Sequence, residues 1–305
     1  MNAHRVPLLC LIDLPAEAVS ALRERYELLR PEDGVPDSCR GIITGYGGKV
    51  DATLLARYPN IEIIACFTSG RDMVDTEAAS RKGIDVVSNG AALAGSVADL
   101  AVALMLASAR ELPALDAHVR SGRWRERRYR PGILLSGQRL GVAGYGAIGQ
   151  GIIRRAMAFG MEVATFTRRP PHDNFVRHFS DLKTMTTWAN WLVLALPGDP
   201  STDGIVNEDV LKALGPEGTL INIGRGSLVD EAALIRMLET GGIRGAALDV
   251  FEDEPTPNPA FAKLANVILS PHQGANTSAA LSLRSKALRE MLDDKFQDAA
   301  GKQNC

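Results

Sequence analysis

Residues 139–149 read Arg-Leu-Gly-Val-Ala-Gly-Tyr-Gly-Ala-Ile-Gly, an apolar run that passes directly into three spaced glycines. The run Leu140–Ala143 has the length and composition of a buried strand, and a helical pattern starts at Ile148. A strand, a glycine turn and a helix in this order are typical of the dinucleotide site of a doubly wound α/β domain. The motif predicts six cofactor-binding residues, namely Gly144, Tyr145, Gly146, Ala147, Ile148 and Gly149.

The three glycines have different roles in such a turn. Gly144 permits the tight bend, Gly146 lets the backbone approach a pyrophosphate, and Gly149 lets the helix pack closely on the strand. The helix N-terminus adds unpaired N–H groups and partial positive charge, which favour phosphates. A purely structural glycine turn is the alternative interpretation.

The end of the next expected strand, Glu162–Phe166, indicates which dinucleotide binds. A NAD site usually has an acidic residue here, which bonds the ribose 2′-hydroxyl. This chain instead has Thr167, Arg168 and Arg169. A guanidinium can pair with a 2′-phosphate through charge-assisted hydrogen bonds of roughly 1.5–3 kcal/mol each. The pattern predicts NADP(H) as the preferred cofactor, with NAD(H) as the second choice; two solvated arginines are the alternative.

Short apolar runs alternate with helical patterns along the chain, which predicts parallel α/β architecture. The expected elements of the first third are Val6–Ile12, Gly41–Thr44, Ile61–Phe67 and Ile84–Val87 as strands, and Ala16–Tyr26, Ala52–Tyr58, Thr76–Lys82 and Ser96–Arg110 as helices. Those of the second series are Leu140–Ala143, Glu162–Phe166, Trp191–Leu196, Thr219–Ile223, Gly245–Val250 and Asn266–Leu269 as strands, with Ile148–Phe159, Glu231–Glu239 and Ser278–Phe296 as helices. Two doubly wound domains, the second inserted in the first, are the simplest arrangement.

Composition excludes several classes of protein. The 305 residues are 46% apolar and 23% charged, with a net charge of −2, which argues against a nucleic-acid binder. The longest apolar stretch, Val97–Ala109, is shorter than the roughly 20 residues that a bilayer requires, and we expect no membrane segment. The four cysteines lack metal-ligand spacing, so no metal site is expected. Cys10 and Cys66 lie in strand-like runs, where buried free thiols fit a reducing cytoplasm.

Three later segments each place a polar residue just after an expected strand: Arg225, Glu254 and His272. Because ligands of parallel sheets bind outside the carboxyl ends of the strands, these side chains can meet there although they are far apart in sequence.

With these motifs the sequence resembles the D-isomer-specific 2-hydroxyacid dehydrogenases over nearly its whole length. The shared motifs are the segment Asn89–Asp99, the glycine motif, Leu196–Pro197 with Thr202, and the segments around Arg225, Glu254 and His272. The resemblance implies a flavodoxin-like substrate domain (1–96 with 279–305), a Rossmann coenzyme domain (97–278), a cleft between them, and a homodimer built around the long helix. Within the family, the segment Thr167-Arg168-Arg169 is most similar to that of the NADPH-preferring glyoxylate/hydroxypyruvate reductases.

In that family the matched Arg225, Glu254 and His272 are the catalytic set, and the chemistry requires the same residue types. Reduction of a 2-keto acid needs a hydride at the carbonyl carbon and a proton at its oxygen. His272 can be protonated near neutrality, and Glu254 beside it would favour the imidazolium and fix the ring. Arg225 offers a planar fork to the substrate carboxylate. A structural histidine is the alternative for His272.

Further roles follow from the resemblance alone. Backbone amides of Ser69 and Gly70 should hold the substrate carboxylate, together with Arg225 and His272. Asp249 should bond the nicotinamide carboxamide; the alternative is a carboxylate that merely ends a strand. Ser96 should approach the nicotinamide, and it can also cap the long helix, since the two roles are compatible. The remaining cofactor-binding residues are expected to be Leu196, Pro197, Thr202, Ile223, Gly224 and Gly274. Arg71, Asp199 and Gln273 depart from the family pattern, and Arg71 either adds charge at the substrate mouth or points to solvent.

The favoured function is NADPH-dependent reduction of a small 2-keto acid, of the glyoxylate or hydroxypyruvate type, to the D-2-hydroxy acid. Reduction of a bulkier aromatic or sugar-derived keto acid is the second hypothesis, because the sequence does not display the pocket. A cofactor-sensing protein, similar to the corepressors that resemble this family, is the alternative from a different class.

Overall fold

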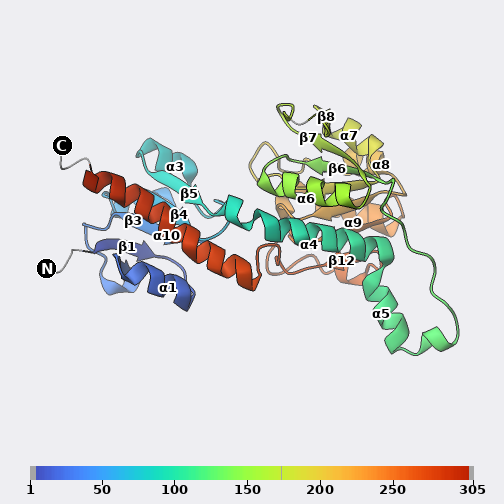
Figure 1. Ribbon diagram of the computed structural model, residues 1–305, viewed down its shortest axis with the longest axis horizontal. Helices are drawn as coiled ribbons and strands as arrows, with labels where there is room; N and C mark the ends of the chain where they lie inside the picture. Colours follow the sequence, from blue (N-terminus) through green and yellow to red (C-terminus); the bar gives the residue numbers. More distant parts are fainter. Residues whose placement is uncertain (1–4, 173, 302–305) are drawn as a thin grey trace. The chain divides into compact units, whose positions relative to one another are not determined.

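The computed structural model describes residues 5–172 and 174–301. The chain divides into two compact units, the first formed by residues 1–93 with 276–305 and the second by residues 94–275. The expected junctions, after residues 96 and 278, each lie three residues further along. Figure 1 labels most of the helices and strands of both units.

The first unit is built on a five-stranded parallel sheet with the order β2-β1-β3-β4-β5. Its strands are β1 (Val6–Cys10), β2 (Tyr26–Leu29), β3 (Gly41–Thr44), β4 (Ile63–Cys66) and β5 (Asp85–Ser88). Its helices are α1 (Ala16–Arg23), α2 (Ala52–Arg57), α3 (Thr76–Arg81) and α10 (Ser278–Gly301). This strand order is that of flavodoxin-like folds, which confirms the predicted fold class.

Both faces of this sheet are covered, because successive strand side chains point to opposite sides. Leu8 and Ile43 pack with residues of α1 and α10, whereas their neighbours Leu9 and Ile42 pack with residues of α2 and α3. The continuous apolar runs of the sequence follow from this two-sided burial.

The second unit is built on a seven-stranded parallel sheet with the order β12-β11-β10-β9-β6-β7-β8. Its strands are β6 (Arg139–Ala143), β7 (Glu162–Phe166), β8 (Arg177–Phe179), β9 (Trp191–Leu194), β10 (Thr219–Asn222), β11 (Gly245–Leu248) and β12 (Val267–Leu269). Its helices include α6 (Ala147–Ala158), α7 (Leu182–Trp188), α8 (Glu208–Leu214) and α9 (Glu231–Glu239). The order reverses between β6 and β9, as in the Rossmann fold.

Several elements differ from the sequence prediction. The strands β2 and β8 were not expected, and Tyr26 begins a strand instead of ending a helix. The long helix α4 (Gly90–Arg110) begins six residues earlier than Ser96. Just past the end of α4, Pro113 occupies the first turn of a further helix that was not predicted, α5 (Leu112–Arg120). Proline is tolerated in a first turn because the N–H group it lacks has no intrahelical partner there.

Helix α4 is long and apolar enough, by length and composition, to cross a membrane, with a mean hydropathy of 1.8. The sequence argument from length was therefore wrong for this segment. The helix nevertheless lies in the core: Val97, Ala101 and Met105 are buried in one cluster with Val142 of β6 and Ile152 of α6. We interpret α4 as a core helix of the second unit.

Candidate active site

The glycine turn has the close contacts that the motif predicts. Gly144 follows β6 with a φ of +105°, in the left-handed region that favours glycine. A Cβ there would lie 2.5 Å from the carbonyl oxygen of Ala195, which follows β9. A Cβ on Gly149 would lie 2.1 Å from the carbonyl oxygen of Gly144. Any side chain at either position would force the turn and the helix apart.

Gly146 differs, because no heavy atom of the described residues lies within 4 Å of its Cβ position. It is the N-cap of α6, and no side chain caps this helix. Gly146 and Ala147 are exposed, so the first-turn N–H groups face open space at the point where the strand order reverses. Open space, uncapped N–H groups and a helix dipole fit a pyrophosphate. These residues would hold a dinucleotide.

The carboxyl ends of neighbouring strands carry the other predicted cofactor residues. The loop after β9 contains Leu196, Pro197 and Thr202, and the hydroxyl of Thr202 donates to the carbonyl of Pro197 at 2.9 Å. After β10, Ile223 and Gly224 are buried, and the Gly224 N–H donates to the Asn222 side chain. The sheet order places these loops beside the glycine turn.

The Thr-Arg-Arg segment follows β7, with both arginines exposed. The hydroxyl of Thr167 donates to the carbonyl of Arg169, and a ring nitrogen of His178 on β8 lies 3.0 Å from the carbonyl of Thr167. Asp199 lies near Arg168: hydrogen bonds from Ser201 lower the pKa of Asp199, and the charge of Arg168 adds to this effect. The loop after β9 therefore brings an acidic charge within electrostatic range of Arg168.

Arg225 follows β10, and its position is fixed by the local backbone. The Asn222 side chain donates to the carbonyl of Arg225 at 2.9 Å, and the guanidinium donates to the carbonyl of Gly224 at 2.7 Å. The next residue, Gly226, lies against the loop that follows β11, since a Cβ there would be 1.9 Å from the carbonyl carbon of Phe251. The Arg225 segment and the Glu254 loop are therefore in direct backbone contact.

Glu254 and His272 meet, although 18 residues separate them. The Nδ1–H of His272 donates to Oε2 of Glu254 at 2.7 Å, and Oε1 of Glu254 accepts from the Phe251 N–H at 3.0 Å. The side chains of His272 and Glu254 are 35% and 18% exposed. With Nδ1 directed at the carboxylate, Nε2 is the ring nitrogen that can present a proton to a ligand.

The turn that carries His272 is held by Asp249, which is 1% exposed. One carboxylate oxygen of Asp249 accepts from the Ser270 hydroxyl and from the Gln273 N–H (2.7 Å), and the other accepts from the Gly274 N–H (2.8 Å). His272 has a φ of +54°, which is uncommon for a residue other than glycine. Asp249 is thus a structural anchor of the turn, and a contact with a nicotinamide stays a prediction.

Ser96 is not a helix cap, because α4 begins at Gly90. Its hydroxyl donates instead to the carbonyl of Gly274 at 2.9 Å, which places it beside the His272 turn. In the first unit, Ser69 and Gly70 follow β4, and the Asn89 N–H donates to the carbonyl of Thr68 next to them. Arg71 is exposed.

Among the other expectations, the buried thiols are confirmed: Cys10 and Cys66 are free and buried, and burial raises the pKa of each to about 11. His118 of α5 is 3% exposed, and a ring nitrogen lies 3.0 Å from the carbonyl of Arg127. In the described part of the chain, no cluster of His, Cys, Asp and Glu could hold a metal ion.

Comparison with known proteins assigns the family. The model of the D-isomer specific 2-hydroxyacid dehydrogenase, NAD binding domain, matches residues 102–274. A 2-ketogluconate reductase of Gluconobacter oxydans is 40% identical over 252 residues, 83% of this chain and 81% of that protein. A glyoxylate/hydroxypyruvate reductase of Arabidopsis thaliana is 36% identical over 281 residues, 89% and 90% of the two chains. The chain belongs to the D-isomer-specific 2-hydroxyacid dehydrogenases.

Solved structures agree with this assignment. The NADPH-dependent glyoxylate/hydroxypyruvate reductase of Sinorhizobium meliloti, in complex with NADP and malonate, superimposes with a TM-score of 0.89 at 36% identity, covering 96% of this chain and 94% of that one. This 2-hydroxyacid dehydrogenase is therefore an oxidoreductase with an NAD-binding domain, and its relatives reduce 2-keto acids. The predicted family and enzyme class are confirmed.

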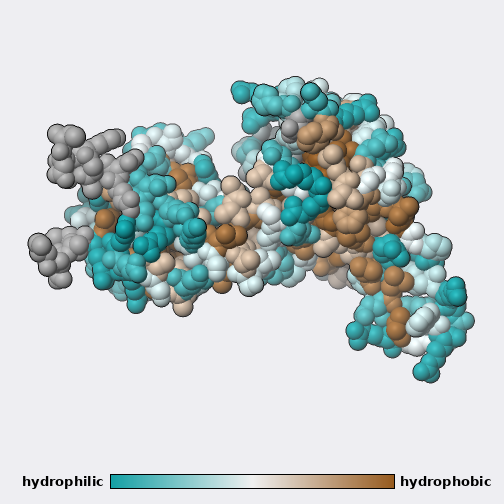
Figure 2. Space-filling model, in the orientation of Figure 1, coloured by the Kyte–Doolittle hydropathy of each residue, from teal (hydrophilic) through white to brown (hydrophobic). Residues whose placement is uncertain are grey.

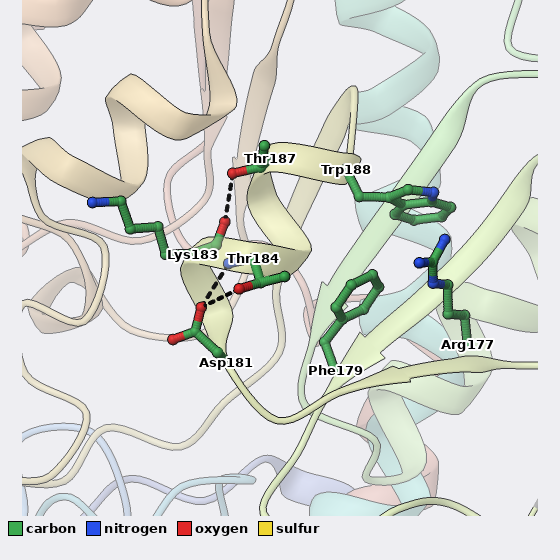
Figure 3. Close-up of a pocket in the computed structure, with 7 residues that line it drawn as sticks. All are labelled: Arg177, Phe179, Asp181, Lys183, Thr184, Thr187 and Trp188. Carbon is green, nitrogen blue, oxygen red and sulfur yellow. Dashed lines mark hydrogen bonds between the residues drawn. The ribbon is translucent and has the colours of Figure 1, made fainter.

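A hollow on the second unit of this dehydrogenase lies between β8 and α7 (Figure 3). The guanidinium of Arg177 stacks on Phe179 and Trp188, with Cζ 4.7 and 5.5 Å from the ring centroids. Asp181 accepts from both the N–H and the hydroxyl of Thr184. Because these polar groups already bond one another, we assign no ligand to this hollow.

Proposed function

We propose that this dehydrogenase reduces a 2-keto acid to the D-2-hydroxy acid with NADPH, using His272 and Glu254 as an acid pair. The observation that carries the proposal is the 2.7 Å contact between these side chains, on loops that follow the adjacent strands β12 and β11. The glycine turn lies at the carboxyl edge of the same sheet. A proton donor and a cofactor cradle on one edge are what such a reduction requires.

In this proposal a bound nicotinamide dinucleotide supplies the hydride to the carbonyl carbon. His272 holds the proton on Nε2 for the carbonyl oxygen, while Glu254 at Nδ1 stabilises the imidazolium and fixes the plane of the ring. Arg225 pairs with the substrate carboxylate and polarises the ketone. The role of the Ser69 and Gly70 amides, in the loop after β4 of the first unit, stays a prediction of the family resemblance.

The preference for NADPH rests on the exposed guanidiniums of Arg168 and Arg169 after β7. A 2′-phosphate there would gain charge-assisted hydrogen bonds that a 2′-hydroxyl cannot make. The Sinorhizobium meliloti reductase, described as NADPH-dependent with NADP bound, supports this preference. Asp199 opposes it, so we expect discrimination weaker than two arginines alone would give.

The proposed substrate class is the small type represented by glyoxylate and hydroxypyruvate, which the names of several relatives carry. A sugar-derived keto acid is the second candidate, because the Gluconobacter oxydans relative, at 40% identity, is a 2-ketogluconate reductase.

We further propose a homodimer in the cytoplasm. Exposed apolar side chains on and beyond α5 support a subunit contact, and the α5 region shows apolar atoms among charged ones in Figure 2. They are Leu112, Val119, Trp124 and Leu134, between 49% and 75% exposed. Free, buried thiols at Cys10, Cys39 and Cys66 support a reducing compartment.

The test is oxidation of NADPH and NADH by the purified protein with glyoxylate, hydroxypyruvate, 2-ketogluconate and hydroxyphenylpyruvate. We expect NADPH-dependent turnover of one of the first three, with a kcat/KM at least roughly tenfold higher than with NADH, as one net charge-assisted bond would give. Turnover with NADH alone would overturn the cofactor assignment. Tight NADPH binding without turnover of any keto acid would instead favour a cofactor sensor.

A further inference from the structure

Glu231 is a buried carboxylate that the proposed mechanism does not use. It is the first residue of α9 and only 8% exposed. The helix does not need it as a cap, because Asp230 already accepts from the Ala233 N–H at 2.8 Å. The side chain of Glu231 therefore has a different task from helix capping.

Its partner lies in the loop that carries Glu254. Oε1 of Glu231 accepts from the Glu252 N–H at 2.8 Å. The preceding N–H, that of Phe251, donates to Glu254 itself. Two successive backbone donors of this loop are therefore held by carboxylates, one from within the loop and one from α9.

The same loop touches the segment that leads into α9. Gly226, which precedes Glu231 in that segment, lies so close that a Cβ would be 2.2 Å from the Glu252 nitrogen. The loop is thus clamped between the backbone of Gly226 and the carboxylate of Glu231. Since Gly226 follows Arg225, the clamp ties the Arg225 segment to the Glu254 loop.

This arrangement has an energetic cost. Burial raises the pKa of Glu231 more than the hydrogen bond from the Glu252 N–H lowers it, and the charges of Glu252 and Asp253 add to the rise. The ionised form of a carboxylate is destabilised in such surroundings, so fold stability alone does not explain a glutamate at position 231. A hydrogen bond to a charged acceptor does hold a backbone N–H more firmly than a neutral one.

We propose that Glu231 is a positioning residue that fixes the backbone of Glu252 and thereby holds Glu254 against His272. The inference rests on the proposed function, since it assigns Glu231 an effect only through that pair. Loss of the acceptor would let the 251–254 loop shift, and a displacement near 1 Å at a catalytic group can cost about a hundredfold in rate. For a loop still clamped by Gly226 we expect a smaller loss, about tenfold in kcat.

The experiment compares Glu231→Ala, Glu231→Gln, Glu254→Gln and the double variant Glu231→Ala/Glu254→Gln, with Glu239→Ala as a control. Glu239 is an exposed carboxylate at the other end of α9. We expect Glu231→Ala to lower kcat about tenfold without changing the Kd for NADPH. Glu231→Gln keeps an acceptor oxygen and should stay within about threefold of the parent, and Glu239→Ala should match the parent.

The double variant is decisive, because the effects of substituting two coupled residues do not add. If Glu231 acts through Glu254, Glu231→Ala should cost less than about twofold once Glu254 is already Gln. An equal tenfold loss in both backgrounds, or a kcat within about twofold of the parent for Glu231→Ala, would overturn the inference and leave the proposed acid pair intact. Full activity of Glu254→Gln would instead refute the acid pair, and the role of Glu231 with it. If the alanine variant unfolds, Glu231→Met, which keeps the side-chain volume and removes the acceptor, takes its place in the same cycle.

Discussion

Replacement of Asp249 by Asn tests whether the turn around His272 is held as the structure shows. The carboxylate accepts three hydrogen bonds, from Ser270, Gln273 and Gly274. An amide has one acceptor oxygen, so at least one of these bonds is lost and an N–H group faces another donor. A bond to a charged group contributes roughly 1.5–3 kcal/mol, and the remaining bonds weaken towards the neutral value of about 1 kcal/mol. Asp249→Asn should therefore destabilise the fold by about 3–5 kcal/mol.

Asp249→Asn should also lower activity, because it disturbs the position of His272. His272 has a left-handed backbone, and the bonds to Asp249 hold the residues on both sides of it. We expect kcat to fall about a hundredfold, because a displaced catalytic group loses orientation. Ser270→Ala is the matched control: it removes one donor and leaves both N–H bonds, so it should cost about 1–2 kcal/mol and less than about tenfold in kcat.

The assay combines thermal unfolding, steady-state kinetics and NADPH titration. A loss of about 3–5 kcal/mol corresponds to a melting temperature roughly 8–15 °C lower for a unit of this size. Because Asp249 is also a predicted nicotinamide contact, the Kd for NADPH is measured separately, and kcat is compared at saturating cofactor. An Asp249→Asn variant with the parental melting temperature and kcat would refute the anchoring role of this carboxylate.

Three further predictions concern the cofactor site and Glu231. Asp199→Asn removes a negative charge that interacts electrostatically with Arg168, so it should lower the KM for NADPH about two- to fivefold and leave the KM for NADH unchanged; an equal change for both cofactors would contradict this prediction. Gly146→Val fills open space, so it should weaken NADPH binding at least tenfold with little change in melting temperature. Gly149→Ala places a Cβ 2.1 Å from a carbonyl oxygen, so it should lower the melting temperature instead. The opposite pattern in NADPH affinity and melting temperature would contradict these assigned roles. The raised pKa of Glu231 means that the folded state binds the carboxyl proton more tightly than the unfolded state does. The protonated side chain therefore stabilises the fold at low pH, and this contribution is lost as the pH rises through the folded pKa. Glu231→Gln should accordingly be more stable than the parent at about pH 8 and match it at about pH 4; urea unfolding at both values checks this, and a constant difference would disagree with it.

Much of the architecture could be predicted because long apolar runs and glycine spacing are local signals. The strands β3 and β7 and the helix α9 have the predicted bounds. The short strands β2 and β8 escaped prediction because each lies at a sheet edge, where a few apolar residues suffice and no alternating run develops. The start of α4 was placed too late because Gly90 and Gly95 weaken the helical signal.

The candidate site was likewise predictable from the sequence only in part. The order of Arg225, Glu254 and His272 at strand ends was visible in the sequence, because strands of a parallel sheet end at one edge. The anchoring by Asp249 was not visible, since its donors lie 21–25 residues away in a turn whose shape depends on tertiary packing. The electrostatic interaction of Asp199 with Arg168 and the hydrogen bond of Glu231 with Glu252 likewise join segments that follow different strands, and no pattern within either segment indicates them.

The central claim is that His272 delivers the proton while Glu254 supports it. Stopped-flow oxidation of bound NADPH in a single turnover, with saturating keto acid, measures the reductive step itself. We predict that His272→Ala lowers this rate at least about a hundredfold, and Glu254→Gln lowers it by an intermediate factor, while both variants keep the parental Kd for NADPH. A single-turnover rate in His272→Ala equal to that of the parent would contradict the account.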